Sequence, residues 1–598
     1  MNIHEKTTSH YERPVNDLQD LFAGPDADPQ VRDGIRQRLD NARKVDLKTA
    51  TIVIASWENR FAAAGGVRAV TQEYAKHLSF QNRSVRVITP LHAGLLTPPG
   101  TVKPPVAVLW VNFEEVNHRI EVYESEWAKV KWVYLYCQGF FAAEGGRDRT
   151  NPYLYEHDAR EERLGRGSPR LVRDCLFYAA ALPKVLSTLD MTDNIVFHLQ
   201  DWETVGVALS VKEAILRKEI TRAVCVLALH NPYDKGLNPA DLKSPGWRLL
   251  SNLPEPTSTP STFLGRMLPL LDAPPATVSR EFAIDLLTDP LQTNHLADHL
   301  QDQFKKFGIK GVDNGPFETV KPPFSANAIN DAKNGKPQAI LSEKRNLWEI
   351  MKKTMGNYKP KERWGNVDFT ALKDDVPVFM CVGRLDPGQK GFDVAARAIE
   401  NLLIAGLNAR FVLTPIVGDA PKPFVDDLQT LAATFPDQVI VYPIRMQKGY
   451  SETQAGCTFS LWPSMYEPFG AVSEFLLRGT PVIARSTGGL RQQVVNFDPK
   501  TKTGNGILYK TSDPTPGINE WRLLQQEANP MDRMNHSIYK DQVEQLADAV
   551  KTAVGIFKDP VAYGYLLSNV HDSVAGYSWN RAEKEYGALY DIATRPQH

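Results

Sequence analysis

Short apolar runs separated by helix-like stretches limit most strongly how this chain can fold. The run T-I-V-I-A-S at 51–56 is rich in β-branched residues and precedes an amphipathic stretch at 67–78. Runs that are apolar on both faces are typical of strands in a parallel sheet covered by helices on both sides. The alternation begins again at V-P-V-F-M-C-V-G, residues 376–383, after an irregular, polar segment at 318–373. The pattern therefore predicts an α/β doubly wound domain twice.

The chain length of 598 residues also requires more than one hydrophobic core. Single cores stop growing at about 250–300 residues, so two large domains are the natural expectation. We expect the N-terminal extension to be polar and partly mobile, with a charged helical stretch near 29–45. The expected boundaries are 1–46 for this extension, 47–320 for the first domain, 321–373 for a linker or insertion, 374–572 for the second domain and 573–598 for a C-terminal segment.

Charge and cysteine content exclude several classes of protein. The 69 basic and 70 acidic side chains leave a net charge of −1, so no overall field favours nucleic acid or an anionic membrane. The five cysteines are scattered and form no C-x-x-C pair, which disfavours a zinc or redox motif and fits a reducing compartment. The N-terminus lacks a signal-peptide pattern, and no apolar run approaches the roughly 18 residues of a transmembrane helix. We therefore expect a cytoplasmic protein without a membrane span.

In the first domain, polar residues follow the expected strands, where ligands of open α/β sheets bind. Gly65 and Gly66 lie between the first strand and its helix, and exposed amides there suit a phosphate. A glycine pair that only permits tight packing is an equally good explanation. Two further apolar runs end in H-L-Q-D-W and in His-Asn. A lone histidine of this kind is more often structural, but two neighbouring strand ends favour a site. The candidate residues at these two ends are His198, Gln200, Asp201, Trp202, His230 and Asn231.

In the second domain, charged residues follow two expected strands. Arg384 and Lys390 lie on the loop after the strand at 376–383, where a guanidinium and an ammonium suit a diphosphate. Glu467 and Glu474 follow the run F-S-L-W-P-S, and carboxylates accept hydrogen bonds from paired sugar hydroxyls. The alternatives are a solvated charged loop for the two cations, and a helix N-terminal acid plus a surface acid for the glutamates.

Taken in order, these residues resemble the motifs of retaining glycosyltransferases with two Rossmann-like domains, most closely the glycogen/starch synthases. The resemblance spans about residues 50–592. The matching segments are Gly65-Gly66, the H-L-Q-D-W of 198–202, the L-H-N of 229–231, the T-V-S-R-E-F-A of 277–283, Asn314-Gly315, the pair Arg384 and Lys390, the segment 467–489 with its Thr-Gly-Gly-Leu, and the Y-S-W helix of 577–590.

The resemblance implies a fold of two Rossmann-like doubly wound domains that face each other across a deep cleft, the GT-B type. The first domain would bind the acceptor and the second the nucleotide-sugar donor, with the C-terminal helix returning to the first domain. The donor would be ADP-glucose or UDP-glucose and the acceptor an α-glucan, with retention of configuration. The resemblance implies no metal or other cofactor.

The resemblance also implies a role for each candidate residue. Arg384 and Lys390 would stabilise the departing diphosphate, Glu467 would hold hexose hydroxyls, and Glu474 would hold the ribose. His198 and Asp201 would line the catalytic sugar pocket. Further donor-binding residues would be Gly65, Gly66, Gly470, Thr487, Gly488 and Gly489, and further residues of the acceptor or sugar pocket would be Gln200, Trp202, His230 and Asn231.

The chain departs from the family pattern at four places. Ala63 and Ala64 stand where the family has a lysine before the paired glycines, and Gln200 replaces the second histidine of the H-x-H-D-W motif. The spacing from Arg384 to Lys390 is one residue longer than usual, and Glu467 and Glu474 lie one residue closer together.

Asp26 and Asp28 form an Asp-x-Asp pair, but the prolines and glycine around it predict a turn and no metal clamp.

Three other functions remain open at this point. A transferase acting on a small acceptor, of the sucrose- or trehalose-forming type, would share the donor residues. A nucleotide-sugar epimerase can share the two-domain architecture, although the separated glutamates fit it poorly. A non-catalytic sugar-binding relative is suggested by the missing lysine and by Gln200. The sequence leaves open the nucleotide base, the acceptor and the oligomeric state.

Overall fold

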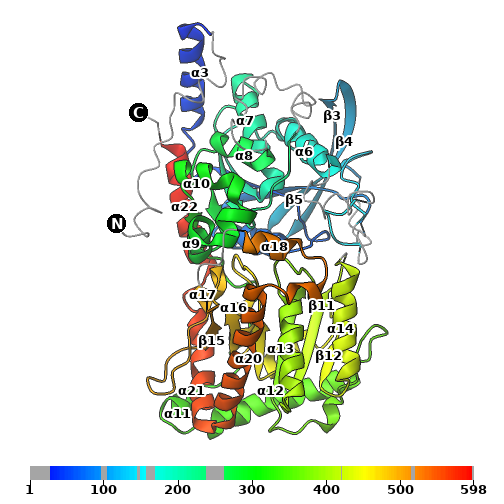
Figure 1. The fold of residues 1–598 in the computed structure, drawn as a ribbon. Helices are drawn as coiled ribbons and strands as arrows, with labels where there is room; N and C mark the ends of the chain where they lie inside the picture. The colour runs from blue at the N-terminus through cyan, green and yellow to red at the C-terminus, as the bar shows by residue number, and fades with distance from the viewer. Residues whose placement is uncertain are drawn as a thin grey trace. The chain divides into compact units, whose positions relative to one another are not determined.

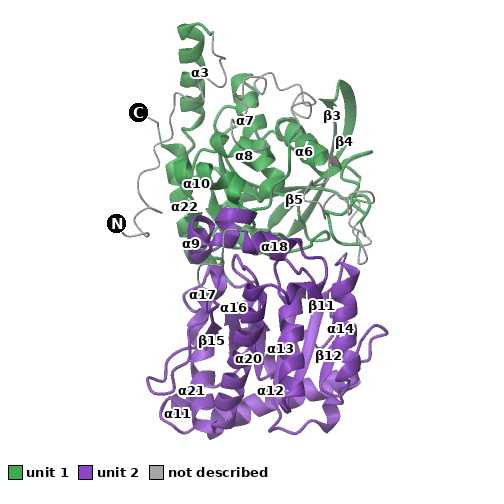
Figure 2. Cartoon of the chain, in the orientation of Figure 1, with its two compact units in different colours: residues 1–278, 296–315, 579–598 green, residues 279–295, 316–578 purple. Residues whose placement is uncertain are grey.

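The computed structural model describes residues 27–95, 104–144, 149–155, 169–237, 262–418, 420–446, 448–512 and 519–595. The chain forms two compact units, coloured separately in Figure 2. Unit 1 comprises Met1–Val278, Leu296–Gly315 and Trp579–His598, and unit 2 comprises Ser279–His295 and Pro316–Ser578. Each unit has its own largely parallel sheet with helices around it, so the prediction of two Rossmann-like α/β domains is confirmed.

The sheet of unit 1 has the strand order β3-β4-β5-β2-β1-β6-β7-β8-β9. Its strands are parallel except for the antiparallel pairs β3–β4 and β4–β5. The strands are β1 (Thr51–Ser56), β2 (Ser84–Pro90), β3 (Ala107–Phe113), β4 (Val116–Trp127), β5 (Val130–Cys137), β6 (Ile195–Gln200), β7 (Ala223–Leu229), β8 (Ala276–Thr277) and β9 (Lys310–Gly311).

The run at 51–56 forms β1 in the middle of this sheet, between β2 and β6. Ile52, Val53 and Ile54 are fully buried because helices cover both faces, as the absence of polar alternation predicts. The helices of unit 1 are α3 (Pro29–Ala42), α4 (Val67–Phe80), α6 (Pro169–Thr188), η2 (Trp202–Thr204), α7 (Val207–Leu216), α8 (Phe263–Met267), η4 (Leu268–Leu270), η6 (Asp298–Leu300), α10 (Gln301–Phe307) and α22 (Trp579–Thr594).

The sheet of unit 2 is parallel and has the strand order β12-β11-β10-β13-β14-β15. Its strands are β10 (Val378–Arg384), β11 (Arg410–Ile416), β12 (Val439–Val441), β13 (Phe459–Trp462), β14 (Val482–Arg485) and β15 (Gly506–Tyr509). Figure 1 shows α13 and α20 side by side over this sheet, and the two helices are in contact.

The helices of unit 2 are α9 (Arg280–Thr288), the π-helix η5 (Gln292–Leu296), α11 (Ala326–Lys333), α12 (Gln338–Asn357), η7 (Phe369–Ala371), α13 (Phe392–Ile404), α14 (Lys422–Thr434), α15 (Tyr450–Gly456), α16 (Val472–Leu477), α17 (Gly488–Gln493), α18 (Glu520–Gln526), α19 (Pro530–Arg533), α20 (Ser537–Lys558), α21 (Pro560–Val570) and η8 (Asp572–Val574). None of the described helices is long and apolar enough to cross a membrane.

The first domain is not continuous over 47–320, because the segment Ser279–His295 belongs to unit 2. Its helix α9 packs against α17, and the Phe282 ring stacks on Tyr466 at a centroid distance of 6.3 Å. The chain returns to unit 1 at Leu296 and leaves it again after Gly315. The final helix α22 packs on β7 and α4 of unit 1, where the C-terminal segment was expected to return.

The segment 321–373 is not a linker. Its helices α11 and α12 pack against α21, and α12 also packs against α15, so the segment is an integral part of unit 2. The apolar positions Ile340, Trp348, Met351 and Met355 of α12 are buried at helical spacing. The polarity of the segment comes from the exposed face of these helices.

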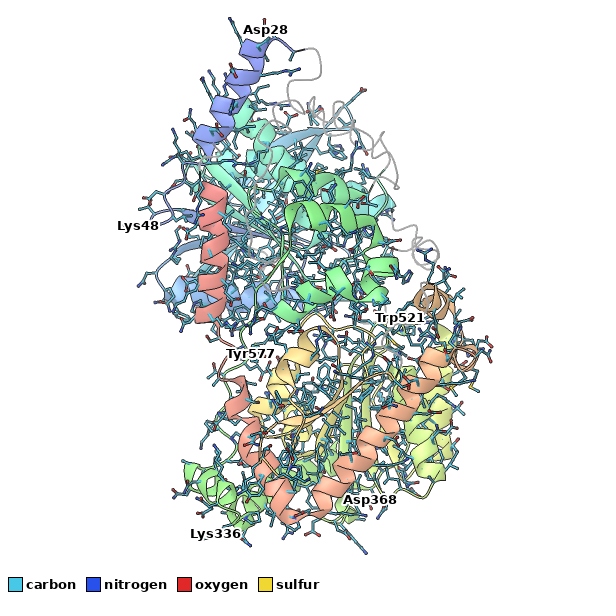
Figure 3. The ribbon with its side chains drawn as sticks, turned by 60° about the vertical axis from the view of Figure 1, so that its left-hand side comes forward. Asp28, Lys48, Lys336, Asp368, Trp521 and Tyr577 are labelled. Atoms are coloured by element: carbon cyan, nitrogen blue, oxygen red, sulfur yellow. The ribbon has the colours of Figure 1, made fainter. Side chains whose placement is uncertain are left out.

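The N-terminal extension is likewise anchored where the structure describes it. Asp28, labelled in Figure 3, caps α3 by accepting a hydrogen bond from the Gln30 amide at 2.7 Å. Residue 26 of the acidic pair lies outside the described residues. Leu39 and Ala42 at the end of α3 are buried, and Arg43 forms an ion pair with Asp272 of unit 1 at 3.0 Å.

Lys344 on α12 is a buried lysine with hydrogen-bond partners on two other helix ends. Its Nζ donates to the carbonyl oxygens of Ala455 and Gly479 at 2.7 and 3.0 Å, and to Thr480 Oγ1 at 2.9 Å. Ala455 lies at the end of α15 and Gly479 follows α16, so Lys344 satisfies carbonyls that helix ends leave unpaired. Burial lowers the pKa of Lys344 to about 8 from the usual 10.5.

This pKa predicts that stability rises between pH 8 and pH 10.5. In that range the unfolded chain binds more protons at Lys344 than the folded chain does, so raising the pH favours folding. The slope is up to about 1.4 kcal/mol per pH unit for one proton. Comparing the thermal midpoint of Lys344→Met with that of the wild-type protein at pH 7.5 and 9.5 tests this. The variant should lack part of the rise, whereas Lys353→Met, on the exposed side of α12, should keep it. Identical pH dependence in Lys344→Met and wild type would contradict the assignment.

Candidate functional site

The loop after β10 places both predicted cations of unit 2 at the carboxyl end of a central strand. Arg384 is the last residue of β10, and its Nη2 donates to Gln389 Oε1 at 2.7 Å. Gly391 adopts φ +66°, and a Cβ there would lie 2.1 Å from the carbonyl oxygen of Pro463. Only glycine allows this approach. The approach brings Lys390 to the loop that follows β13.

Lys390 forms an ion pair with Glu467 on that neighbouring loop. The distance from Lys390 Nζ to Glu467 Oε2 is 2.6 Å, and Ser464 Oγ donates to the same oxygen at 3.1 Å. Both side chains are largely buried, so the pair is only weakly screened by solvent. Gly470 adopts φ +79°, and a Cβ there would lie 2.9 Å from Cγ of Glu467. The predicted residues Lys390, Glu467 and Gly470 therefore lie together.

These residues lie at the topological switch point of unit 2. The chain runs outward from β10 through β11 to β12, then returns to β13 on the other side of β10. Loops after β10 and β13 therefore diverge in opposite directions, which is where open α/β sheets bind ligands. Two cations and one carboxylate at such a point can bind an anion that carries hydroxyl groups.

Glu474 has different neighbours from Glu467. It lies in the first turn of α16, and Glu318, Arg478 and Tyr450 are the charged and polar groups close to it. Burial and the nearby Glu318 carboxylate raise the pKa of Glu474 to about 8. It is therefore mostly protonated at neutral pH. Glu467 and Glu474 thus have different neighbours, and the predicted contact of Glu474 with a ribose stays a prediction.

The amides of Gly488 and Gly489 are occupied by groups of unit 2. Gly488 N donates to Asp285 Oδ2 at 2.6 Å, and Gly489 N donates to the Glu467 carbonyl at 2.8 Å. Thr487 Oγ1 also donates to Asp285, at 3.3 Å. A Cβ on Gly488 would lie 2.2 Å from the Glu467 carbonyl oxygen. The glycines serve this close backbone approach, which corrects the expectation that their amides are open to a diphosphate.

In unit 1, the Gly65-Gly66 turn is filled by a carboxylate. Glu58 Oε1 accepts from the amides of Ala64 and Gly65 at 3.1 and 2.9 Å, and its Oε2 accepts from Arg68 N at 2.9 Å. Glu58 thus occupies the place that a phosphate would take at this helix start. The Gly65 amide is therefore paired within unit 1, which favours the tight-turn explanation of the glycines, and its expected donor-binding role stays a prediction.

Asp201, Trp202, His230 and Asn231 do lie together at the carboxyl ends of β6 and β7. Asp201 adopts φ +64°, which is unusual for a residue with a side chain. Its Oδ1 accepts from the amides of Trp202 and His230 at 3.2 and 3.3 Å. Burial raises the pKa of Asp201 to about 7 in spite of these hydrogen bonds. The strained backbone and the raised pKa both favour a functional role for Asp201.

Gln200 and Asn231 carry buried polar atoms at the same strand ends. Gln200 Oε1 lies 2.6 Å from His230 Nε2, and burial lowers the pKa of His230 to about 3, so the imidazole is neutral and donates here. Gln200 Nε2 and Asn231 Oδ1 are buried and have no hydrogen-bond partner among the described residues. A donor and an acceptor of this kind can bind sugar hydroxyls.

His198 is held by different partners from those of Asp201 and Gln200, and its predicted place in a sugar pocket stays a prediction. It is in the middle of β6, and its Nδ1 lies 2.8 Å from Tyr590 Oη on α22. The rings of Tyr74 and Tyr586 pack against the imidazole at 5.3 and 4.6 Å. Burial lowers its pKa to about 3. The histidine is a core residue under the C-terminal helix, because side chains of a strand point to a face and only its end reaches the ligand edge.

Sequence reasoning missed an acidic group around Asp201. Glu203 is buried, and burial together with the nearby Asp201 raises the pKa of Glu203 well above its usual range. Tyr153 Oη donates to Glu58 Oε1 at 3.1 Å. Glu58 was detectable as an acid between the first strand and the glycine pair, but nothing in the sequence pairs Tyr153 with it. No group of three or more His, Cys, Asp or Glu side chains in the described ranges is arranged to hold a metal.

Comparison with known proteins matches both units to glycosyltransferase models. Residues 51–260, within unit 1, match the model described as "Starch synthase catalytic domain". Residues 363–540, within unit 2, match the model described as "Glycosyl transferases group 1". Glycogen synthase 1 of Geobacter metallireducens is 26% identical over 76% of this chain and 84% of its own. Glycogen synthase of Koribacter versatilis is 24% identical over 89% of this chain and 96% of its own.

A solved structure gives the same fold. The catalytic domain of starch synthase IV from Arabidopsis thaliana, bound to ADP and acarbose, superposes with a TM-score of 0.68 at 19% identity, over 91% of this chain and 99% of that one. The two Rossmann-like units and the two matched models define the protein as a GT-B glycosyltransferase. More narrowly, it is a glycogen/starch synthase-like glycosyltransferase. The recognition made from the motifs is thereby confirmed.

Proposed function

We propose that the protein transfers glucose from ADP-glucose or UDP-glucose to an α-glucan, with retention and without a metal or other cofactor. The relatives named glycogen synthase support the glucan acceptor, and the similar Arabidopsis enzyme is bound to ADP and acarbose. All five cysteines are buried and free of disulfides, which supports a cytoplasmic location.

The observation that carries this proposal is the arrangement of Arg384, Lys390 and Glu467 at the switch point of unit 2. A guanidinium and an ammonium on one short loop match the two charges of a diphosphate. The Glu467 carboxylate, 2.6 Å from Lys390 Nζ, is an acceptor for hydroxyl groups of a sugar next to that diphosphate. The donor would therefore bind to unit 2.

The chemical step needs charge stabilisation on the leaving group. As the bond from the anomeric carbon to the diphosphate breaks, negative charge grows on the diphosphate oxygens, and Lys390 and Arg384 would stabilise it without a metal. Glu467 would hold Lys390 in place before the donor arrives. No side chain is assigned as a covalent nucleophile. The acceptor hydroxyl would therefore attack the face from which the diphosphate departs and pass its proton to the departing phosphate oxygen, with retention.

In unit 1, the strand-end residues would bind sugar hydroxyls. Gln200 Nε2 would donate and Asn231 Oδ1 would accept, because both are buried without a partner among the described residues. The neutral His230 orients the Gln200 amide. Asp201, with a pKa of about 7, can accept or donate a hydrogen bond at neutral pH.

Turnover of nucleotide sugars against acceptors tests the proposal. ADP-glucose, UDP-glucose and other nucleotide hexoses are each combined with glycogen, maltooligosaccharides, fructose and glucose 6-phosphate, and nucleotide release is measured. Release should require a glucose donor and a glucan, and the anomeric configuration of the early product should be α. Transfer to a small acceptor alone would replace the glucan proposal by a sucrose- or trehalose-forming activity. If no donor is bound or turned over, the transferase proposal fails.

A further inference from the structure

The hairpin of β3 and β4 carries exposed apolar side chains at the edge of the unit 1 sheet. Trp110 is 61% exposed and Val108 is 43% exposed, and they share one face of β3 because alternate residues of a strand point the same way. The opposite face, with Leu109 and Val111, is buried, and β3 packs there against α6. The hairpin is labelled at the edge of unit 1 in Figure 1. Exposed apolar groups clustered in this way mark a binding surface.

Polar and aromatic side chains complete this face of the sheet. In the register of the strands, Trp110 pairs with Arg119, Val108 with Glu121, and Glu121 with Tyr136, so their side chains share one face. We call these side chains, together with Tyr123, the hairpin face. Arg119 and Tyr123 both donate hydrogen bonds to Glu121. The two charges of the hairpin face are therefore paired with each other.

The hairpin face continues toward the loop that carries Glu58. Tyr123 pairs with Tyr134 on β5, and the Tyr134 ring stacks on Phe61 at a centroid distance of 6.0 Å. Phe61 lies on the loop between β1 and α4, three residues after Glu58. Tyr136 lies near the carboxyl end of β5, which runs parallel to β2 and ends at Cys137, and Trp110 lies on the same side. The aromatic side chains thus run from the outermost strand β3 to the loop after β1, at the carboxyl ends of the parallel strands.

We propose that the hairpin face is a second carbohydrate-binding surface, which holds a long α-glucan and leads it to the strand-end residues of unit 1. The inference rests on the proposed glucan acceptor. The C–H groups of a glucose ring form an apolar face that stacks on an indole or phenol ring. Hydroxyl groups at the ring edge can bond to the planar side chains of Arg119 and Glu121. A surface whose charges are internally paired suits an uncharged polymer and offers no net charge to an ionic partner.

Binding to glycogen in the absence of donor tests the hairpin face. Trp110→Ala should migrate with little retardation in a native gel containing glycogen. Its apparent dissociation constant should be about tenfold higher than that of the wild-type protein, which corresponds to a lost aromatic contact of about 1.4 kcal/mol. In steady state, the half-saturating concentration of glycogen should rise by a similar factor. The value for maltotriose and kcat should stay unchanged, because a short acceptor needs only the strand-end residues.

Ile404→Ala is the matched control, because Ile404 is 72% exposed on α13 of unit 2. Trp110→Phe should recover most of the binding. Wild-type retardation of Trp110→Ala, or no retardation of the wild-type protein, would overturn the inference. A change of sedimentation coefficient in Trp110→Ala would also overturn it and would assign the face to a second copy of the chain. Glycogen binding through Trp110 without turnover of any donor would refute only the proposed transfer.

Discussion

Lys390→Ala is expected to lower kcat/KM for a nucleotide-glucose donor by about a thousandfold, as the loss of one group that stabilises transition-state charge does. Lys390 is the only ammonium paired with Glu467 in the described part of the chain, at 2.6 Å. Its removal deprives the departing diphosphate of a cation and leaves a buried carboxylate beside it, which repels the same charge. Initial rates of nucleotide release, with calorimetric binding of ADP, measure both effects.

The control for Lys390→Ala is Lys422→Ala, which removes an exposed lysine that pairs with Asp426 on the surface of α14. This variant should keep full activity. Lys422→Ala should unfold at the wild-type temperature, and Lys390→Ala should keep a cooperative unfolding transition above the assay temperature, so that a lost fold is distinguished from lost chemistry. Arg384→Ala should show a loss of similar order. Near-normal turnover in Lys390→Ala would remove the diphosphate clamp from the proposed mechanism.

The strands of both sheets could be predicted because the local run of apolar residues shows that they are buried. The runs that became β1 and β10 are apolar on both faces, and this identifies them as covered parallel strands. The assignment of Ser279–His295 to unit 2 could not be predicted in the same way. Its helix α9 is held by remote partners, such as Arg491, whose Nη2 lies 2.6 Å from Asp285 Oδ1. Contacts over such sequence separations leave no periodic signal.

The candidate site shows the same division between local and remote information. Lys390 and Glu467 were predicted because each follows a strand directly, and parallel strands end at one edge of a sheet. The packing of His198 under α22 could not be predicted, because its partner Tyr590 is 392 residues away. Spacing along the sequence places a residue on a strand, but the residues packed above it decide whether it can reach a ligand.

The backbone amides of the glycine turns also show that remote residues decide whether a group can reach a ligand. Exposed amides at Gly65 and Gly488 are a fair expectation from the motif, since a helix start attracts anions. In the structure the anions are the chain's own carboxylates, Glu58 and Asp285. These internal carboxylates occupy amides of both turns, so Arg384 and Lys390 are the groups that we expect to meet the phosphates.

The second large effect is expected at Asp272, the centre of a buried ion cluster in unit 1. Its carboxylate accepts from Arg43 at 3.0 Å and from Lys212 at 2.6 and 2.5 Å, and from the Cys225 amide at 2.8 Å. All three charged side chains are almost fully buried. Asp272→Asn removes the negative charge and leaves two cations in a medium of low polarity. It should destabilise unit 1 by about 3–5 kcal/mol, as breaking a buried ion pair does.

In a scanning calorimeter, the transition of unit 1 in Asp272→Asn should fall by about 10 °C, given about 2–4 °C per kcal/mol for a unit of this size. Asp302→Asn, which replaces an exposed carboxylate on α10, should leave the transition temperature of unit 1 unchanged.

Because a buried ion cluster costs desolvation energy, the combined replacement of Arg43 and Lys212 by methionine and Asp272 by leucine should destabilise unit 1 less than Asp272→Asn alone. An unchanged transition in Asp272→Asn would show that the cluster is solvated and would leave the N-terminal extension without its anchor. Since Arg43 directly follows α3, a loosened cluster should also expose the α3 segment to limited proteolysis before the rest of unit 1 unfolds.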